Sequence, residues 1–415
     1  MQPYDMKELE ERVILVGVQE SFSEDVEESL DELAELCETA GALVVGRVIQ
    51  NREKIHPGTY VGKGKIEEIA LLMEELGATG IVCDDELSPA QLNNLEKELD
   101  CKVMDRTLII LDIFAARANT SEGNIQVELA QLRYRAARLV GLRNSLSRLG
   151  GGIGTRGPGE KKLEMDRRLI HARISQLKAE LAQVQKHREL IRSKRKKDQM
   201  VVAAIVGYTN AGKSTLLNTL TDAGVLEEDK LFATLDPTTR LLELPGGQNI
   251  LLTDTVGFIR KLPHHLIEAF KSTLEEAKYA DIIIHVVDAS NPQKEKQMHV
   301  VYETLKDLGV KDQPILTLFN KPDRIENPEI LKDMKADKTL KISAKTGKGL
   351  DDLKDELEKI LCARSILLER VFPYEKAGLI QIVRAKGQLL EEEYRGDGIY
   401  VKAFVPAEIY GKVAY

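Results

Sequence analysis

The sequence predicts a protein of the α/β class, and three observations carry this prediction. Short apolar runs alternate with amphipathic helices over residues 12–105, which is the pattern of a parallel sheet. Two long segments then repeat apolar residues every three or four positions, which predicts a long antiparallel helical hairpin. A glycine-rich turn at 207–214 lies between an apolar run and a helical pattern, and it predicts a second parallel sheet.

An N-terminal α/β domain is expected over residues 1–118. Its strands are predicted at 12–18, 42–49 and 79–83, with a short fourth strand from Lys102. Its helices are predicted from Ser23 to Gly41, at 66–76 and from Ser88, where Pro89 takes the first helical position. The run Tyr-Val-Gly-Lys-Gly-Lys at 60–65 could hold a phosphate. Because no nucleotide-binding strand–helix unit follows it, we expect a structural turn.

Residues 119–198 are predicted to form the helical hairpin. One apolar stripe follows each helix, and the two stripes would pack against each other. The stripes are Ile125, Leu129, Leu132, Ala136, Leu139, Leu142, Leu146 and Leu149, and Leu163, Ile170, Ile174, Leu177, Leu181, Val184 and Ile191. Each helix should be about 40 Å long. Residues 192–198 are expected to be a polar linker.

The turn of the hairpin, residues 149–160, holds six glycines and one proline. Such a segment cannot pack as regular structure, and two or three residues would suffice for a plain turn. Backbone amides and arginines suit the phosphates and irregular shapes of RNA, so we predict RNA contacts here; a spacer without function is the alternative. The predicted contact residues are Arg148, Gly150, Gly151, Gly152, Arg156, Gly157, Lys161 and Lys162.

The charge is unevenly distributed along the chain. The net charge of the whole chain is −8. Residues 1–100 hold 24 acidic and 8 basic side chains, and residues 131–198 hold 19 basic and 6 acidic side chains. The two segments therefore differ in sign, at −16 and +13. A basic segment in an acidic protein is typical of a nucleic-acid surface, and solvated lysine-rich helices are the alternative.

Composition points to a soluble protein of the reducing cytoplasm. Hydrophobic residues make up 43% and charged residues 30% of the chain. No apolar run approaches the roughly 18 residues of a membrane span, and we see no signal peptide. The four cysteines are scattered and show no metal-binding spacing. We expect a cytoplasmic protein that acts as a monomer.

The turn at 207–214 reads G-x-x-x-x-G-K-S, which is the pattern of a phosphate-binding loop. Its glycines let backbone amides and the helix N-terminus surround a polyphosphate. Lys213 should reach the β- and γ-phosphates, and Ser214 should ligate Mg²⁺. This loop predicts a P-loop domain over residues 199–365.

Three further motifs narrow the nucleotide to GTP and the domain to a G domain. Asp254, in D-T-V-G, can organise Mg²⁺ through water, and the amide of Gly257 can meet the γ-phosphate. In N-K-P-D, the carboxylate of Asp323 can accept hydrogen bonds from guanine N1–H and the 2-amino group. Adenine lacks this donor pair, so the carboxylate would reject ATP. The run Ser343-Ala-Lys345 would offer a backbone amide to guanine O6.

The loop at 232–240 should contribute the threonine that ligates Mg²⁺ when GTP is bound. Thr234, Thr238 and Thr239 compete for this role. We favour Thr234, because F-x-T-x-x-P resembles the corresponding loop of Obg-like GTPases. The predicted catalytic groups are Lys213, Thr234 and Gly257, and the predicted metal ligands are Ser214, Thr234 and, through water, Asp254.

The predicted nucleotide contacts fall in five segments. They are Gly207, Tyr208, Thr209, Asn210, Ala211, Gly212, Lys213, Ser214 and Thr215; Phe232, Ala233, Thr234, Leu235 and Asp236; Asp254, Thr255, Val256 and Gly257; Asn320, Lys321 and Asp323; and Ser343, Ala344 and Lys345.

Position 258 is phenylalanine, where many small GTPases have glutamine. A phenylalanine cannot orient the attacking water, so intrinsic hydrolysis should be slow and a partner should complete the site. The alternative is that Phe258 packs in a core while another group positions the water.

The last part of the chain, residues 366–415, is expected to be a small C-terminal α+β domain. Strands are predicted at 379–385 and 398–405, with Gly387 and Gly396 at turns.

The sequence resembles the HflX family of translation-associated GTPases over nearly its whole length. The matching motifs are T-Y-V-G-K-G-K-I-E-E at 59–68, L-G-G-G-I-G-T-R-G-P-G-E at 149–160, F-A-T-L-D-P-T-T-R at 232–240 and D-T-V-G-F-I at 254–259. The resemblance implies Mg²⁺-dependent GTP hydrolysis. It also implies binding to the large ribosomal subunit and its rRNA, dissociation of 70S ribosomes under stress or stalling, and a hairpin tip near the peptidyl-transferase RNA.

Two other functions stay open at this point. One is an ATP-dependent RNA remodeller that uses the N-terminal domain, because ATP use is claimed for parts of the family. We find no second Walker-type loop in the sequence. The other is a passive ribosome hibernation or assembly factor, in which GTP hydrolysis only times release.

Overall fold

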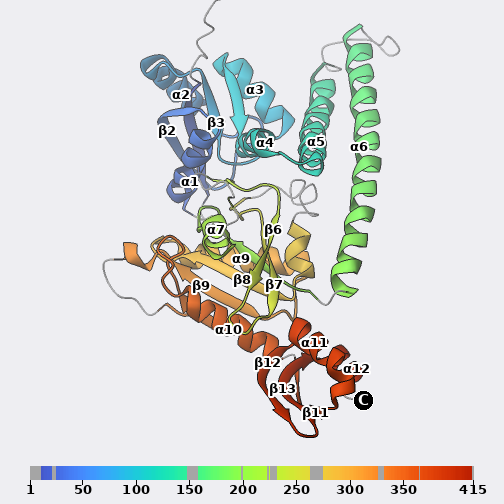
Figure 1. The fold of residues 1–415 in the computed structure, drawn as a ribbon. Helices are drawn as coiled ribbons and strands as arrows, with labels where there is room; N and C mark the ends of the chain where they lie inside the picture. Colours follow the sequence, from blue (N-terminus) through green and yellow to red (C-terminus); the bar gives the residue numbers. More distant parts are fainter. Residues whose placement is uncertain are drawn as a thin grey trace, which may run out of the picture. The chain divides into compact units, whose positions relative to one another are not determined.

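We describe the fold from a computed structural model, which describes residues 11–20, 25–146, 158–197, 200–221, 224, 231–261, 274–325, 331–363 and 365–413. The chain packs as two compact units (Figure 1). The first comprises Met1–Ile191, Glu228–Asp236 and Ile259–Thr273, and the second comprises Arg192–Glu227, Pro237–Phe258 and Leu274–Tyr415. Two short segments that flank the nucleotide motifs thus pack with the N-terminal unit.

The N-terminal α/β fold is confirmed. A parallel sheet has the order β2-β1-β3-β4. Its strands are β1 (Arg12–Glu20), β2 (Leu43–Arg52), β3 (Gly80–Cys83) and β4 (Lys102–Asp105). Its helices are α1 (Val26–Thr39), α2 (Lys63–Leu76), α3 (Pro89–Leu99) and α4 (Arg106–Arg117). Apolar residues of β1 and β3 are fully buried among these helices, so this domain has its own core.

The local signals at helix ends act as predicted at Ser88 and Gly41. Ser88 caps α3 in a capping box with Gln91, and Pro89 follows at the first position. Gly41 lies just after α1 with φ +89°, a conformation that favours glycine. The predicted start at Ser23 lies outside the described residues, and the described N-cap is Asp25. Within the run at 60–65, only Tyr60–Gly62 precede the helix, and residues 63–65 form the first turn of α2, which therefore begins before the predicted residue 66.

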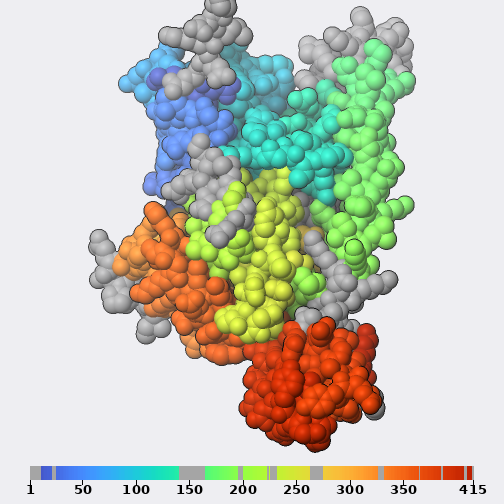
Figure 2. Space-filling model, viewed as in Figure 1, coloured from blue at the N-terminus to red at the C-terminus, as the bar shows by residue number. Residues whose placement is uncertain are grey.

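The helical hairpin consists of α5 (Ser121–Leu146) and α6 (Pro158–Lys197), which lie side by side in Figures 1 and 2. Its seam contains eight residues of the predicted apolar stripes: Leu129, Ile174 and Leu177 are buried, and Ile125, Leu132, Ala136, Ile170 and Leu181 are half-buried. The prediction is wrong for Ile191, which is 42% exposed because it lies beyond Arg188, the residue that pairs with Glu122 at the start of α5. Two ion pairs also join the helices. Arg173 binds both oxygens of Glu128, and Arg188 binds Glu122.

The second helix is longer than predicted, because residues 192–197 continue it and do not form a linker. Its 40 residues correspond to about 60 Å. Lysine and arginine are good helix formers, so a charged run does not end a helix. Arg192 is also held by Glu276 at 2.6 Å and lies over the ring of Tyr279.

The second parallel sheet has the order β10-β9-β8-β5-β7-β6, with only β6 antiparallel to its neighbour. Its strands are β5 (Val201–Gly207), β6 (Thr238–Glu243), β7 (Asn249–Asp254), β8 (Ile282–Asp288), β9 (Ile315–Asn320) and β10 (Lys338–Lys341). The associated helices are α7 (Lys213–Thr221), α9 (Lys294–Leu308), η1 (Pro322–Arg324) and α10 (Leu350–Ala363). Its core is continuous from β5 to α10.

The C-terminal part is a three-stranded antiparallel sheet, order β11-β13-β12, with helices. Its elements are β11 (Ser365–Phe372), η2 (Tyr374–Lys376), α11 (Ala377–Lys386), β12 (Gln388–Arg395), β13 (Gly398–Pro406) and α12 (Ala407–Val413). The predicted strand at 379–385 is wrong, because this segment lies in α11. Ile380 and Val383, three residues apart, are buried against the sheet, and this tertiary packing outweighs the β-propensity of the run.

Within the described residues, no helix is long and apolar enough to cross a membrane.

Candidate nucleotide-binding site

The phosphate-binding loop connects β5 to α7. β5 ends at Gly207 and α7 begins at Lys213, so backbone amides at the helix N-terminus are directed at the space above the loop. Gly212 has φ +94°, and a Cβ atom there would lie 2.3 Å from the side-chain nitrogen of Asn320. Glycine at 212 is therefore required by both the backbone conformation and the close approach of the base-binding loop.

Lys213 is buried, with 6% of its surface exposed. Its ammonium donates to the carbonyl of Tyr208 at 2.8 Å. Burial lowers the pKa of Lys213 to about 8, while Asp254 acts to raise it and Lys321 acts to lower it further. The loop thus keeps the Lys213 ammonium in a place where water stabilises it poorly, and a bound polyphosphate would stabilise this cation.

Ser214 and Asp254 meet although they are 40 residues apart in sequence. The hydroxyl of Ser214 donates to Asp254 Oδ2 at 2.7 Å, and Asp254 is fully buried at the end of β7. A hydroxyl and a carboxylate provide the hard oxygen ligands that Mg²⁺ prefers. This pair fits the predicted metal position, and the described residues contain no competing cluster of three His, Cys, Asp or Glu side chains.

The backbone after Asp254 runs directly against the phosphate-binding loop. The amide of Phe258 donates to Gly207 O at 3.1 Å, and the amide of Thr209 donates to Phe258 O at 2.8 Å. A Cβ atom at Gly257 would lie 2.9 Å from the Cα of Thr209 and 3.1 Å from Lys213 Nζ. Only glycine fits here, and its amide lies beside the lysine that should meet the γ-phosphate.

Phe258 itself is packed, with 1% of its surface exposed. This is the arrangement expected if Phe258 belongs to a core. The ring offers no hydrogen bond to a water molecule in any position, so another group must orient the attacking water.

The base-binding loop is braced through Asn320. Its side-chain nitrogen donates to the carbonyl of Ala211 at 2.9 Å, and its side-chain oxygen accepts from the amide of Ala344 at 2.9 Å. Lys321 donates to the carbonyl of Asn210 and pairs with Asp288, both at 2.8 Å. The phosphate-binding loop and both base-binding segments are therefore connected by hydrogen bonds.

The groups expected to recognise guanine differ in whether they already form hydrogen bonds within the protein. Asp323 lies exposed in η1, and no donor among the described residues is bonded to its carboxylate. The amides of Ser343 and Ala344 donate to Lys348 O and Asn320 Oδ1. The run 343–345 was predicted to offer one amide to guanine O6, and within the described residues only the amide of Lys345 has no acceptor.

The segment 232–236 packs within the first unit. The ring of Phe232 meets the ring of Phe114 edge to face, with centroids 4.7 Å apart, and Leu235 is buried. The carboxylate of Asp236 accepts from the amides of Asn119 and Thr120 at 2.9 Å each. Ala233 and Thr234 lie half-buried in this segment, and their nucleotide contacts stay predictions.

Sequence reasoning missed a charged cluster at the carboxyl ends of β3 and β4. Asp84, Asp105 and Arg106 are buried there, and Lys261 joins Asp84 and Asp85. The available signal was an Asp-Asp pair directly after a predicted strand, because the carboxyl ends of parallel strands commonly hold ligands.

The predicted RNA contacts cannot be located. Arg148, Gly150, Gly151, Gly152, Arg156 and Gly157 lie outside the described residues. Lys161 and Lys162 belong to α6, and only their backbone is described.

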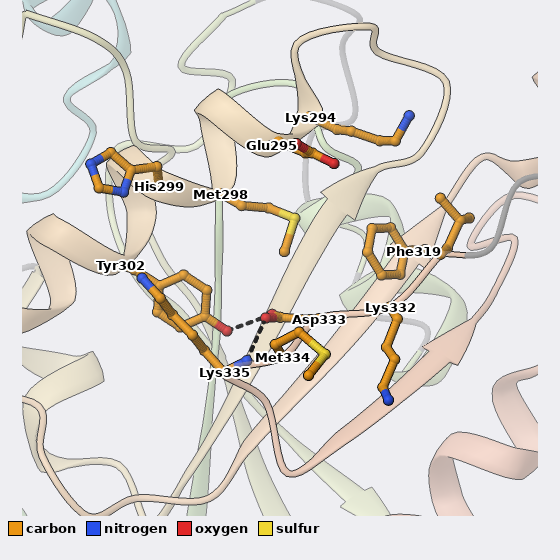
Figure 3. Close-up of a pocket in the computed structure, with 11 residues that line it drawn as sticks. Lys294, Glu295, Met298, His299, Tyr302, Phe319, Lys332, Asp333, Met334 and Lys335 are labelled. Carbon is orange, nitrogen blue, oxygen red and sulfur yellow. Dashed lines mark hydrogen bonds between the residues drawn. The ribbon is translucent and has the colours of Figure 1, made fainter.

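A cavity of about 630 Å³ lies beside α9 and β9 (Figure 3). None of the predicted nucleotide contacts lines it. Its central carboxylate, Asp333, accepts from Tyr302 at 2.5 Å and from Thr317 at 2.7 Å. Its buried polar group is thus satisfied within the protein, and we assign the cavity no ligand.

Replacing Asn320 with alanine should weaken both the fold and nucleotide binding. The change leaves the carbonyl of Ala211 and the amide of Ala344 without their buried partner, at a cost of about 2–4 kcal/mol in unfolding free energy. Urea unfolding and GTP titration measure the two effects. Asn249→Ala, at an exposed position at the start of β7, is the matched control. Wild-type stability in Asn320→Ala would show that the bracing contacts are dispensable.

Comparison with known proteins gives consistent matches along the chain. Three family models match in succession: GTP-binding GTPase N-terminal over residues 27–115, GTP-binding GTPase Middle Region over 117–195, and 50S ribosome-binding GTPase over 202–321. The chain is 69% identical over 410 residues to the GTPase HflX of Lacrimispora saccharolytica, covering 99% of this chain and 97% of that protein.

Two further proteins are similar to this chain. The GTPase HflX of Caldanaerobacter subterraneus is 51% identical over 399 residues, with 96% and 92% of the two chains covered. A solved GTP-binding protein from Sulfolobus solfataricus in complex with GDP is 25% identical, with a TM-score of 0.44 over 84% of this chain and 98% of that chain.

Proposed function

The chain belongs to the GTPase HflX family, and we propose that it is a GTPase that binds the large ribosomal subunit and dissociates 70S ribosomes. GTP would act as a conformational switch, and hydrolysis would release the factor. The single observation that best supports the nucleotide part is the Asn320 brace between the phosphate-binding and base-binding loops. The match to the 50S ribosome-binding GTPase model supports the ribosomal part.

In the proposed reaction, each group of the site has a distinct role. Lys213 neutralises the β- and γ-phosphates, and the amide of Gly257 donates to the γ-phosphate. Ser214, Thr234 and, through water, Asp254 would hold Mg²⁺, which supplies positive charge to the phosphate oxygens. Asp323 accepts from guanine, and the amide of Lys345 is the donor that remains for O6.

Hydrolysis should be slow in the free protein and faster on the ribosome. The packed ring of Phe258 cannot orient water, so a group from the partner or a rearranged segment has to do so. Nucleotide state can drive subunit separation only through a difference in ribosome affinity between the GTP and GDP forms.

The helical hairpin is the proposed RNA-binding arm. Arg167, Arg168, Lys178 and Lys186 are exposed along α6, and Arg168 also pairs with Glu164 of the same helix. Arg173 and Arg188 bind acids of α5. The exposed cations suit phosphates, and the glycine-rich chain that joins α5 to α6 suits irregular RNA. The boundaries 1–118, 119–198, 199–365 and 366–415 remain our proposal for the domains.

Replacing residues 150–159 with a short Gly-Ser turn should separate RNA engagement from nucleotide binding. We expect GTP affinity and the thermal midpoint to stay unchanged, because these residues do not belong to the G domain. Ribosome-stimulated hydrolysis and splitting of 70S ribosomes, followed by light scattering, should fall about tenfold or more. Residual binding to large subunits in a pelleting assay should weaken as salt rises, because the cations of α6 still meet phosphates.

The same assays distinguish the rival functions. Full splitting by the shortened protein would reduce the glycine-rich segment to a spacer. Splitting that needs ATP and not GTP would favour the ATP-dependent remodeller. Binding to large subunits without splitting, in GTP or in a non-hydrolysable analogue, would favour the passive hibernation or assembly factor.

A further inference from the structure

Lys261, seven residues after Asp254, is attached to the N-terminal sheet. Its ammonium donates to Asp85 Oδ1 at 2.7 Å and also to the carboxylate of Asp84. Its backbone has φ +51°, which a non-glycine residue adopts only when its surroundings hold it there. The two residues between Phe258 and Lys261 are buried, with Ile259 at 2% and Arg260 at 3% exposure. A short, tightly packed connection therefore joins Lys261 to the Gly257–Phe258 backbone.

The two carboxylates that bind Lys261 are held in place by other side chains. Asp84 is fully buried and also accepts from Arg106 and from Ser29, each at 2.8 Å. Asp85 accepts from the hydroxyl of Tyr60 at 2.7 Å. Burial acts to raise the pKa of Asp84, but Arg106 and Lys261 outweigh it, so the pKa of Asp84 lies below its ordinary value. The carboxylate is ionised and needs both cations.

The Tyr-Val-Gly run at 60–62 gains a role from this arrangement. Tyr60 is buried, has φ +65°, and directs its hydroxyl at Asp85. The turn that we expected to be structural therefore supports the carboxylate that binds Lys261. Nothing else in the described part of the chain bonds to Asp85 through a side chain.

The neighbouring strand end holds the helical hairpin. Cys83, which precedes Asp84, pairs in register with Asp105 at the end of β4. Asp105 accepts from the hydroxyl of Tyr134 at 2.8 Å and from Arg138 at 2.5 Å, and both belong to α5. Adjacent ends of β3 and β4 thus bind Lys261 and the hairpin helix.

A second segment next to the nucleotide motifs is attached to the same helix. Asp236 accepts from the amides of Asn119 and Thr120 just before α5, and from the hydroxyl of Thr120 at 2.5 Å. These bonds satisfy amides at a helix start, which otherwise lack partners. Two chain segments should respond to the γ-phosphate, residues 232–236 and residues 254–261. The first ends at Asp236, which binds the residues just before α5, and the second ends at Lys261, which binds the end of β3.

We propose that Lys261 is a positioning residue that couples the hairpin to GTP hydrolysis through Asp84 and Asp85. A displacement of α5 on the ribosome moves Asp105 and the adjacent end of β3. The ion pair passes this displacement to Lys261, and through two buried residues to Gly257 and Phe258. This proposal rests on the proposed function, because it assigns the path by which the ribosome stimulates hydrolysis. The alternative is that the ion pairs of Lys261 only stabilise the N-terminal domain.

The test uses the full-length chain with Lys261→Met, and Lys261→Arg as the conservative variant. The Met variant should bind GTP, GDP and large subunits as the wild type does, and its intrinsic kcat should change less than threefold. Its stimulation by large subunits should fall about tenfold or more, in kcat and not in KM for GTP. Lys261→Arg keeps the cation and should restore most of the stimulation.

The matched control is Lys102→Met. Lys102 is the first residue of β4 and pairs with Glu11, at the opposite end of the strands from Asp84 and Asp85. It should lose no stimulation. Asp85→Asn removes one of the two carboxylates that bind Lys261 and leaves Asp84, so it should cause a smaller loss of stimulation than Lys261→Met. The double variant should be no worse than Lys261→Met alone, because that substitution already removes both contacts.

The outcomes separate this inference from the proposed function. If the wild type is not stimulated by large subunits, the proposed function fails. If the wild type is stimulated and Lys261→Met is stimulated equally, the coupling role is wrong while the proposed function stands. If Lys261→Met lowers the thermal midpoint but keeps full stimulation, Lys261 only stabilises the N-terminal domain and the coupling role is wrong.

Discussion

Replacing Asp323 with asparagine should change the base preference from guanine to xanthine. The carboxylate accepts two hydrogen bonds from guanine, and an amide places a donor where the 2-amino group also donates. Xanthine has an oxygen at that position and restores the complementarity. We expect GTP affinity to fall by about 3 kcal/mol, on the order of 100-fold, and xanthosine triphosphate to gain by a similar factor.

Because Asp323 is exposed, its substitution should affect base binding without affecting protein stability. Its carboxylate is exposed in η1 and bonds to no donor in the described part of the chain, so the substitution should leave unfolding free energy unchanged. Arg324→Gln, at the exposed neighbouring position, is the control and should leave base preference unaltered. Unchanged GTP affinity without any gain for xanthosine triphosphate would remove Asp323 from the base-binding site.

Replacing Lys213 with methionine should abolish productive GTP binding and yet stabilise the nucleotide-free protein. The variant lacks the cation that meets the β- and γ-phosphates, and loss of a buried charge partner costs about 2–5 kcal/mol of affinity. Filter binding or fluorescence titration would show a fall of roughly 30- to several thousand-fold. Steady-state hydrolysis should disappear with it.

The gain in stability follows from the buried ammonium. Burial lowers the pKa of Lys213 from the ordinary 10.5 to about 8 in the folded protein. Between pH 8 and 10.5 the unfolded chain binds more protons, so wild-type stability rises with pH relative to the variant. Below pH 8, burial of the charged ammonium lowers the unfolding free energy of the wild type by about 3 kcal/mol. Lys213→Met removes this cost, but it also loses the hydrogen bond to Tyr208, which contributes about 1 kcal/mol. Methionine should thus add about 2 kcal/mol at pH 7.

Urea unfolding at pH 7 and pH 10 checks the sign of this effect. The advantage of Lys213→Met should shrink as pH rises. Lys306→Met, at an exposed position on α9, should show neither the gain nor the pH dependence. If Lys213→Met without nucleotide is less stable than the wild type at pH 7, the contacts of Lys213 stabilise the loop by more than the burial of its charge costs.

Local sequence patterns predicted the α/β class and the motif order because they depend on near neighbours. Ser88 and Pro89 start a helix by chemistry within one turn. The glycines at 212 and 257 are required by close approach, and their motifs made them recognisable. The patterns failed at 379–385 and at 192–197, where packing of Ile380 and Val383 and anchoring of Arg192 decided the structure.

By itself, the sequence predicted which residue types would surround a nucleotide: one lysine, one serine, two aspartates and an asparagine at set spacings. Only the tertiary structure decided that Asn320 braces both loops and that the Ser343 and Ala344 amides are already occupied. It also decided that Lys261 meets Asp84, 177 positions away in sequence. Spacing encodes contacts within one strand–turn–helix unit, whereas contacts between distant segments arise only when sheets and helices pack. For that reason motifs could supply the residues that we propose to bind nucleotide, and they could not supply those that we propose to couple the hairpin to hydrolysis.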